Sequence, residues 1–195
     1  MIDDDRALGG NRPPAVPGEQ PPNVVVRPIT SADADGYLDV FATVAAEGRW
    51  IGTEAPISPE RQDRIKSAAS APTDRLFVNV AVDDGRVVGF AGLELDDGLG
   101  HLFMAIVDGY RGQGLGRRLL DGAIGWARDR GAYKVDLEVW PHNAAALRLY
   151  ERAGFVTEGH RRRQWRRRNG QLWDSVQMGL VLDETSPGSS FGSCA

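Results

Sequence analysis

The chain has 195 residues, of which 42% are hydrophobic and 26% are charged, and its formal net charge at neutral pH is −4. It is long enough for one domain with a hydrophobic core and short for two. Its apolar runs are far shorter than the roughly 20 residues that cross a bilayer, and its acidic start does not resemble a secretion signal. We therefore expect a cytoplasmic protein with no membrane partner.

Residues that form disulfides or metal sites are few. Cys194, the one cysteine, is next to the last residue, so no intrachain disulfide can form and a catalytic thiol is not expected. The three histidines, His101, His142 and His160, are scattered and lack the spacing of metal ligands. We expect no metal cofactor.

Both ends of the chain have the composition of tails. Residues 1–22 are rich in proline and poor in large apolar side chains, and residues 184–195 are mostly serine, glycine and other small residues. Such segments cannot bury enough apolar surface to offset the entropy of ordering them. We expect both tails to be disordered and residues 23–183 to form one domain.

The first part of the domain predicts a strand followed by two helices. The β-branched run 24–29 is typical of a strand, and Thr30 or Ser31 can cap a helix that extends to about residue 47. Ser58 precedes a proline at the first helical position, which predicts a second helix over 59–70.

Three consecutive strands follow. Residues 76–82 and 86–95 flank the turn Asp83-Asp84-Gly85 and predict a β-hairpin. A second turn, Asp96-Asp97-Gly98, leads to an apolar strand over 102–107. This meander delivers the chain to a glycine-rich turn.

The glycine-rich turn, Arg111 to Gly116, lies between that strand and the start of a helix. Unpaired N–H groups and the positive end of the helix dipole make this order suitable for a phosphate. A Walker loop would require Lys and Ser or Thr after Gly116, and Arg117 and Arg118 stand there. A dinucleotide fingerprint lacks its third glycine, although Asp136 lies where a ribose-binding acid would be expected. A turn without any ligand is the remaining alternative.

The second half alternates helices and strands. Apolar residues at helical spacing predict a helix to Arg130, and residues 133–140 predict a strand parallel to 102–107, joined by a right-handed crossover. Asn143 can cap a short helix that ends before Gly154. Asn169-Gly170 predicts a hairpin whose return strand alternates apolar residues with Ser175, Gln177 and Gly179. The fold class is α/β with a mixed sheet.

The strand before that hairpin turn carries an arginine run, Arg161 to Arg168, with Trp165 within it. Alternation would place Arg161, Arg163 and Arg167 on one face and Arg162, Arg166 and Arg168 on the other, so we expect a protruding hairpin with neither face fully buried. A surface or subunit contact ranks first among its roles, an acidic or phosphate-bearing substrate second, and nucleic acid third, because the chain is acidic overall. DNA or RNA binding across a salt series would test the third role.

The order of meander, glycine loop, helix, strand, Asn143 and Leu149-Tyr150-Glu151-Arg152-Ala153-Gly154-Phe155 resembles the GNAT superfamily of acyl-CoA-dependent N-acetyltransferases. Within it, the chain is most like bacterial enzymes that acetylate small amines, amino acids or polyamines. The resemblance covers roughly residues 24–182. It implies a mixed, largely antiparallel sheet with a parallel strand-helix-strand unit at its centre and helices on both faces, and it makes 23–183 an acetyltransferase domain. One departure is Asp108-Gly109, where a proline is common in the family.

The resemblance also implies a site for acetyl-CoA as co-substrate. The loop would hold the pyrophosphate by its main chain, the strand before it would pair with the pantetheine arm, and an asparagine on the following segment would touch the same arm. The tyrosine of the family motif, Tyr150 here, would protonate the departing thiolate. The implied coenzyme-binding residues are Met104, Ala105, Ile106, Arg111, Gly112, Gln113, Gly114, Leu115, Gly116 and Asn143.

The chemistry of acetyl transfer agrees with these residues. A phenol of pKa about 10 can protonate a thiolate without being ionised at neutral pH, which suits Tyr150, although a tyrosine at this spacing is also a common core residue. An amine of pKa about 10.4 must first lose a proton. The candidates for its acceptor stay open and are Glu54, Glu94, Glu138, His101 or water.

We therefore expect transfer of an acetyl group from acetyl-CoA to a primary amine, by direct attack in a ternary complex. The partner would be a small-molecule or peptide amine, and a homodimer is left open. The alternative is a GNAT-like domain that binds acyl-CoA as a sensor or regulatory domain without turnover. Binding without reaction would favour the alternative.

Overall fold

The computed structural model describes residues 24–70 and 73–183. The predicted tails, 1–22 and 184–195, lie outside the described residues. The elements are β1 (Val25–Pro28), a 3-10 turn η1 (Ser31–Asp33), α1 (Ala34–Ala46), α2 (Pro59–Ser70), β2 (Leu76–Asp83), β3 (Arg86–Asp96), β4 (Leu99–Ile106), α3 (Leu115–Asp129), β5 (Lys134–Val139), α4 (Ala144–Arg152), β6 (Val156–Arg166) and β7 (Leu172–Val181).

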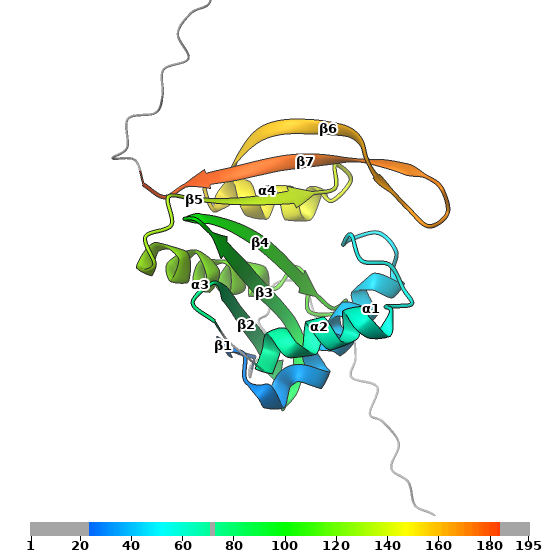
Figure 1. Cartoon of the computed structure of the whole chain (residues 1–195), viewed down its shortest axis with the longest axis vertical. Coiled ribbons are helices and arrows are strands. Elements are labelled where there is room, and N and C mark those ends of the chain that lie inside the picture. Colours follow the sequence, from blue (N-terminus) through cyan, green and yellow to red (C-terminus); the bar gives the residue numbers. More distant parts are fainter. Residues whose placement is uncertain (1–23, 71–72, 184–195) are drawn as a thin grey trace, which may run out of the picture.

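The strands form one seven-stranded sheet in the order β1-β2-β3-β4-β5-β7-β6. All neighbours are antiparallel except β4 and β5, which confirms the parallel unit at the centre of a largely antiparallel sheet. The parallel register covers only Leu99 to His101 against Lys134 to Asp136. Beyond His101 the two strands diverge, as Figure 1 shows, so the sheet is split at its middle.

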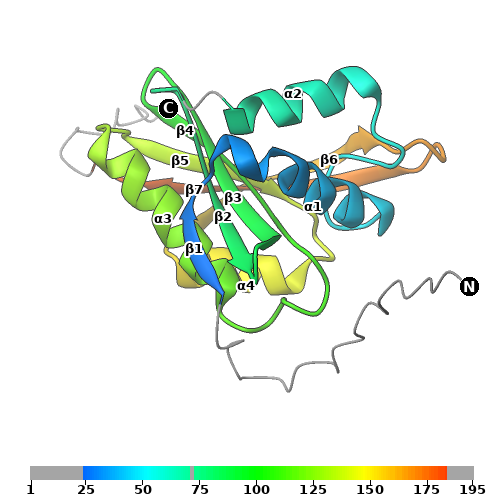
Figure 2. The same cartoon turned by 90° about the horizontal axis from the view of Figure 1, so that it is seen from below.

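Helices cover both faces of the sheet, as the resemblance implied. Figure 2 shows α1 and α2 on one side of the strands and α3 and α4 on the other. The apolar stripe of α3 is buried in the core, including Leu115, Leu119, Ala123 and Ala127. No helix within the described ranges has both the length and the apolar character needed to span a membrane.

Two predicted boundaries differ from the structure. The strand expected at 102–107 begins earlier, at Leu99, and these extra residues are the ones that pair with β5. The helix expected from Thr30 begins with the 3-10 turn η1. There Asp33 accepts hydrogen bonds from Arg27 and from the main chain and hydroxyl of Thr30, which tightens the first turn.

The β6–β7 hairpin does extend beyond the rest of the sheet, and it reaches the loop between α1 and α2 (Figure 1). The predicted strict alternation is wrong, because the register shifts between Arg161 and Trp165 and Arg163 has a φ of 56°. Arg167 is only 3% exposed, although no buried face was expected. Ser175, expected on the outer face of β7, is also fully buried.

Arg167 is buried because it links the hairpin to the loop 48–56. Its guanidinium contacts the main-chain oxygens of Gly48, Ile51 and Gly52 and lies 3.3 Å from the Glu54 carboxylate. It also stacks over Trp173, at 4.5 Å from the ring centroid. The buried arginine therefore has partners for its charge within the chain.

Candidate active site

The glycine loop has the geometry of an anion site. Gly112 and Gly114 both have φ of 76°, a conformation that favours glycine, and Gly114 is the residue before the first turn of α3. A Cβ at Gly112 would meet no atom within 4 Å, so the space beside it is open. Among the described residues, the main-chain N–H groups from Gln113 to Gly116 have no hydrogen-bond acceptor. These amides can bind a phosphate.

The side chains of the loop face the protein. Arg111 donates from Nε to Ile106 O at 2.7 Å and from its two terminal nitrogens to the Glu47 carboxylate at 2.8 and 2.6 Å. Gln113 donates to Gly109 O at 2.7 Å. Both side chains brace the loop, which leaves its main chain to contact a ligand.

Glu47, the residue after α1, is a site residue that the sequence analysis missed. The Arg111 guanidinium is the main cause that holds the pKa of Glu47 below its ordinary value, and a hydrogen bond from Trp50 Nε1 adds to it. Glu47 therefore stays ionised and paired at neutral pH. The only sequence signal for its pairing with Arg111 was its position at the end of a predicted helix.

The edge of β4 that faces β5 is open next to the loop. Val107 N donates to Val88 O on β3, so by the alternation of an antiparallel pair the main-chain groups of Met104 and Ile106 point away from β3. Ile106 O already accepts from Arg111, which leaves its N–H and both groups of Met104 free to pair with an extended ligand. Ala105 directs its main-chain groups to β3 instead.

Helix α4 flanks this open edge. A Cβ at Gly116 would lie 3.1 Å from Leu149 Cδ2 and 3.6 Å from Met104 Cε, so the start of α3, the second half of α4 and the end of β4 meet here. Asn143 Oδ1 caps α4 by accepting from Ala146 N at 3.2 Å, which leaves its side-chain amide N–H groups for a ligand. The predicted loop and strand edge thus meet α4, and Asn143 caps the start of that helix.

Tyr150 lies on α4 with its ring buried and its centroid 5.8 Å from that of Phe155. Within the described part of the chain, no group forms a hydrogen bond with its hydroxyl. Burial raises the pKa of the Tyr150 hydroxyl above its ordinary value, so the side chain stays protonated at neutral and mildly alkaline pH. It can donate a proton or a hydrogen bond.

The opposite face of the split carries a polar pocket of about 320 Å³. A Cβ at Gly154, just after α4, would lie 3.3 Å from Leu180 Cδ1, so Leu180 is on the α4 face of the sheet. Its register partner Val135 is on the same face, and the next residue of β5, Asp136, therefore points to the opposite face. The pocket is lined by His101, Leu102, Asp136, Leu137, Glu138, Arg161 and Gln177.

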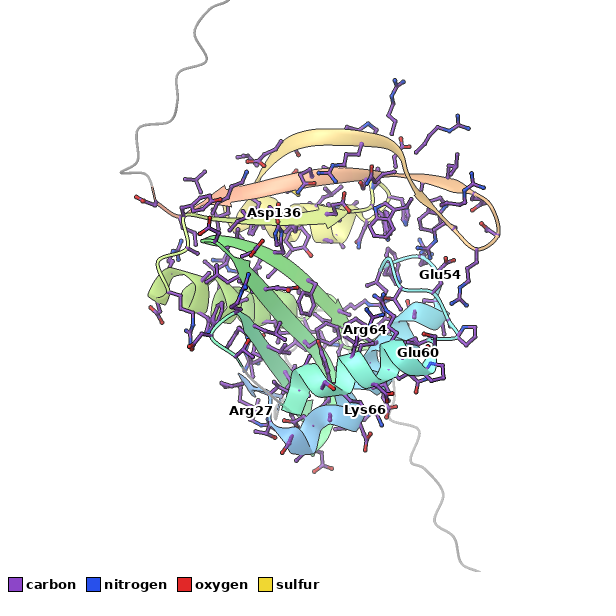
Figure 3. The ribbon with its side chains drawn as sticks, in the orientation of Figure 1. Arg27, Glu54, Glu60, Arg64, Lys66 and Asp136 are labelled. Atoms are coloured by element: carbon purple, nitrogen blue, oxygen red, sulfur yellow. The ribbon has the colours of Figure 1, made fainter. Side chains whose placement is uncertain are left out.

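The four side-chain candidates for the base lie in different surroundings. Glu54 accepts from Arg168 N at 3.0 Å and is paired with Arg167 beside the hairpin (Figure 3). Glu138 accepts from Arg161, Trp165 and Ser175. Glu94 is exposed on β3, opposite His101. His101 Nδ1 lies 2.6 Å from Asp136 Oδ1.

The dinucleotide alternative does not fit. Asp136 lies in the middle of β5 with its carboxylate bound to His101 and Gln177, and not at the strand end where a ribose would be held. Within residues 24–70 and 73–183, no group of three or more histidines, cysteines and acids could hold a metal ion.

A glycine loop with unpaired amides, an open strand edge and a buried tyrosine on the helix that flanks this edge are the features of a domain suited to an extended, phosphate-bearing coenzyme. The family model described as the acetyltransferase (GNAT) family matches residues 43–155, and the chain belongs to this family.

Two known proteins illustrate the similarity in sequence. A mycothiol acetyltransferase of Clavibacter sepedonicus is 32% identical over 142 residues, which cover 70% of this chain and 44% of that protein. The chain thus spans less than half the length of this relative. The [ribosomal protein bS18]-alanine N-acetyltransferase of Escherichia coli is 34% identical over 118 residues, 60% of this chain and 79% of the relative.

Solved structures share the fold. The structure of the Escherichia coli ribosomal-protein-S18-alanine N-acetyltransferase matches this chain with a TM-score of 0.65 at 25% identity. The match covers 87% of this chain and 100% of that structure. An acetyltransferase from Salmonella typhimurium, solved with its cofactor acetyl-CoA, has a TM-score of 0.72 at 23% identity, covering 86% of this chain and 99% of its own.

Proposed function

We propose that the chain transfers an acetyl group from acetyl-CoA to a primary amine by direct attack in a ternary complex, and that residues 23–183 form the catalytic domain. The observation that carries the proposal is the set of unpaired main-chain amides from Gln113 to Gly116. They lie next to the open edge of β4, since Gly116 is close to Met104 and Ile106. A pyrophosphate on these amides places a pantetheine arm along Met104 and Ile106. The thioester then lies at the split between β4 and β5.

The chain's own groups supply what the reaction needs. The amine nitrogen attacks the thioester carbonyl carbon, the C–S bond breaks, and the leaving thiolate takes a proton from Tyr150, whose hydroxyl stays protonated because it is buried. Fixing both reactants in line contributes most of the remaining rate acceleration. The amide N–H groups of Asn143 would hold the pantetheine arm beside Tyr150.

The acceptor amine would be a small molecule or a peptide N-terminus, the two kinds that the names of the relatives suggest. Both could reach the polar pocket beside His101, because it opens on the face away from α3 and α4.

The test is thiol release from acetyl-CoA with a panel of amino acids, polyamines, other small amines and peptides that begin with alanine. We expect at least one class to stimulate release and to appear as its N-acetyl product in mass spectra. Failure of every class would overturn the transferase proposal. Thermal stabilisation by coenzyme A, measured separately, would then favour the acyl-CoA sensor, and its absence would overturn the coenzyme site as well.

A further inference from the structure

We propose that His101, oriented by Asp136, is the catalytic residue that accepts the proton of the substrate amine. The proposal rests on the acetyl transfer proposed above and assigns the base that the sequence left open.

The histidine and the aspartate form a directed pair. Asp136 Oδ1 lies 2.6 Å from His101 Nδ1, while Asp136 Oδ2 accepts from Gln177 Nε2 at 3.1 Å. A carboxylate in contact with Nδ1 favours the tautomer with the proton on Nδ1, which leaves the lone pair of Nε2 free. The Asp136 side chain is only 16% exposed, whereas that of His101 is 51% exposed, so the free nitrogen faces solvent.

His101 also stands at the point where the coenzyme and the amine would meet. It is the last residue of β4 in register with β5, and the open edge at Met104 begins beyond it. Its side chain lies on the face of the sheet opposite α4, in the wall of the 320 Å³ pocket. Tyr150 lies on α4, which covers the other face of the sheet, so an acid and a base would flank the thioester from opposite faces.

The carboxylate candidates are less suitable. Glu138 already accepts hydrogen bonds from three donors, including the Arg161 guanidinium at 2.9 Å, so both of its carboxylate oxygens are engaged by the protein. Glu54 is held by Arg167 and Arg168 of the hairpin, and Figure 3 shows it well apart from Asp136.

Charged groups around His101 come from the neighbouring strands. Glu94 on β3 is its register partner. Two residues before Asp136 on β5, Lys134 pairs with Glu158, with 2.7 Å between Nζ and Oε2. Among the described residues, the charged side chains that neighbouring strands place near His101 include Glu94, Asp96 with its partner Arg75, Lys134, Asp136, Glu138, Glu158 and Arg161.

The proton balance of the step closes without another reactant. The ammonium form of the substrate gives one proton to His101 Nε2, which later releases it to solvent. The neutral amine forms the new C–N bond and loses a second proton as the C–S bond breaks. That second proton returns to Tyr150, which has given its own proton to the leaving thiolate, so the net products are an amide, a free thiol and one proton.

The experiment compares His101→Gln and Asp136→Asn with a matched control, His160→Gln. His160 is 50% exposed and also lies beside an aspartate, Asp174 at 3.5 Å, but on the outer hairpin. We expect His101→Gln to lower kcat/KM for the best amine by about 10² to 10⁴-fold, Asp136→Asn to lower it less, and the control to stay within about twofold. The KM for acetyl-CoA should change little in all three.

The pH profile and chemical rescue distinguish a proton acceptor from a residue that only supports the fold, because loss of a purely structural residue would change neither. The pH dependence of kcat/KM should differ between the wild type and His101→Gln, because the variant lacks the group that accepts the proton of the amine. Added imidazole should restore part of the rate of His101→Gln and none of any loss in Asp136→Asn.

Thermal stabilisation by coenzyme A verifies that each variant is folded, and His101→Asn replaces any His101→Gln protein that is not. A wild-type rate and pH profile in a folded His101 variant would overturn the inference while acetyl transfer stands. A wild type that acetylates no amine would overturn the proposed function, and the inference with it.

Discussion

The guanidinium of Arg111 donates to both carboxylate oxygens of Glu47, at 2.8 and 2.6 Å, and so ties the glycine loop to the end of α1. A third bond, from Nε to Ile106 O, ties the same side chain to the end of β4. The loop that presents the unpaired amides is thus held in place by Glu47, which follows α1, and by Ile106 of β4.

Removing this brace should weaken coenzyme binding. Glu47→Gln loses the charge that pairs with Arg111, and hydrogen bonds between charged groups contribute about 1.5 to 3 kcal/mol. We expect the Kd for coenzyme A, measured by calorimetry, to rise roughly tenfold or more. Asp121→Asn is the control, because it breaks an exposed arginine pair within α3 that should contribute less than 1 kcal/mol. Equal effects of the two substitutions would contradict the brace.

Replacing the proposed acid should separate turnover from binding. Tyr150→Phe should lower kcat by about 10² to 10⁴-fold and leave the Kd for coenzyme A within about twofold. Because burial raises the pKa of Tyr150, the wild-type rate should show no loss from tyrosine ionisation as pH rises from 7 to about 9.5. Tyr37, a buried tyrosine on α1 that packs on Phe41 and Phe90, is the matched position for a Tyr→Phe control. An unchanged kcat in Tyr150→Phe would remove it as the acid.

Because Arg167 links the β6–β7 hairpin to the loop 48–56, we expect substitutions of two arginines of this hairpin to have unequal effects on stability. Arg167→Ala leaves Glu54 and three main-chain oxygens without their buried partner, so we expect the free energy of unfolding to fall by about 3 kcal/mol or more. Arg162→Ala, at an exposed position, should change it by no more than about 0.5 kcal/mol. Urea unfolding measures both, with Arg167→Lys as the milder variant. Similar losses would show that Arg167 does not hold the loop.

The Arg27–Asp33 pair predicts how stability depends on acid. The hydrogen bond from the Arg27 side chain is the largest cause that lowers the pKa of Asp33 from 3.8 to about 2. A lowered pKa in the folded state adds stability at pH values above 4, and this contribution is lost as pH falls from about 4 to about 2. Since Arg27 is partly exposed, we expect about 1 to 2 kcal/mol.

Urea unfolding of the wild type and Asp33→Asn at several pH values tests this expectation. The variant should be less stable at pH 7, and the difference between the two proteins should shrink toward pH 2. A difference that does not depend on pH would mean that Asp33 acts through the shape of its side chain and not through its charge.

The order of helices and strands could be predicted from the sequence because the signals for it are local. Proline and serine at the start of α2, the glycine-rich turns and the apolar stripe of α3 each act within a few residues. The glycine loop could be found for the same reason, since its φ angles and its unpaired amides belong to one short segment. The resemblance then linked that loop to Asn143 and Tyr150.

Other parts of the site depend on contacts between distant residues. β5 pairs with β7 along its whole length but with β4 only at Leu99 to His101, and no local pattern encodes where the pairing with β4 ends. His101 and Asp136 are 35 residues apart in the chain, and Glu47 and Arg111 are 64 apart. The sequence alone determined the elements and the coenzyme loop, because backbone preferences are local. Only the tertiary structure decided that His101 has Asp136 beside it and that Arg167 is buried, because each needs a charged partner that folding brings from elsewhere.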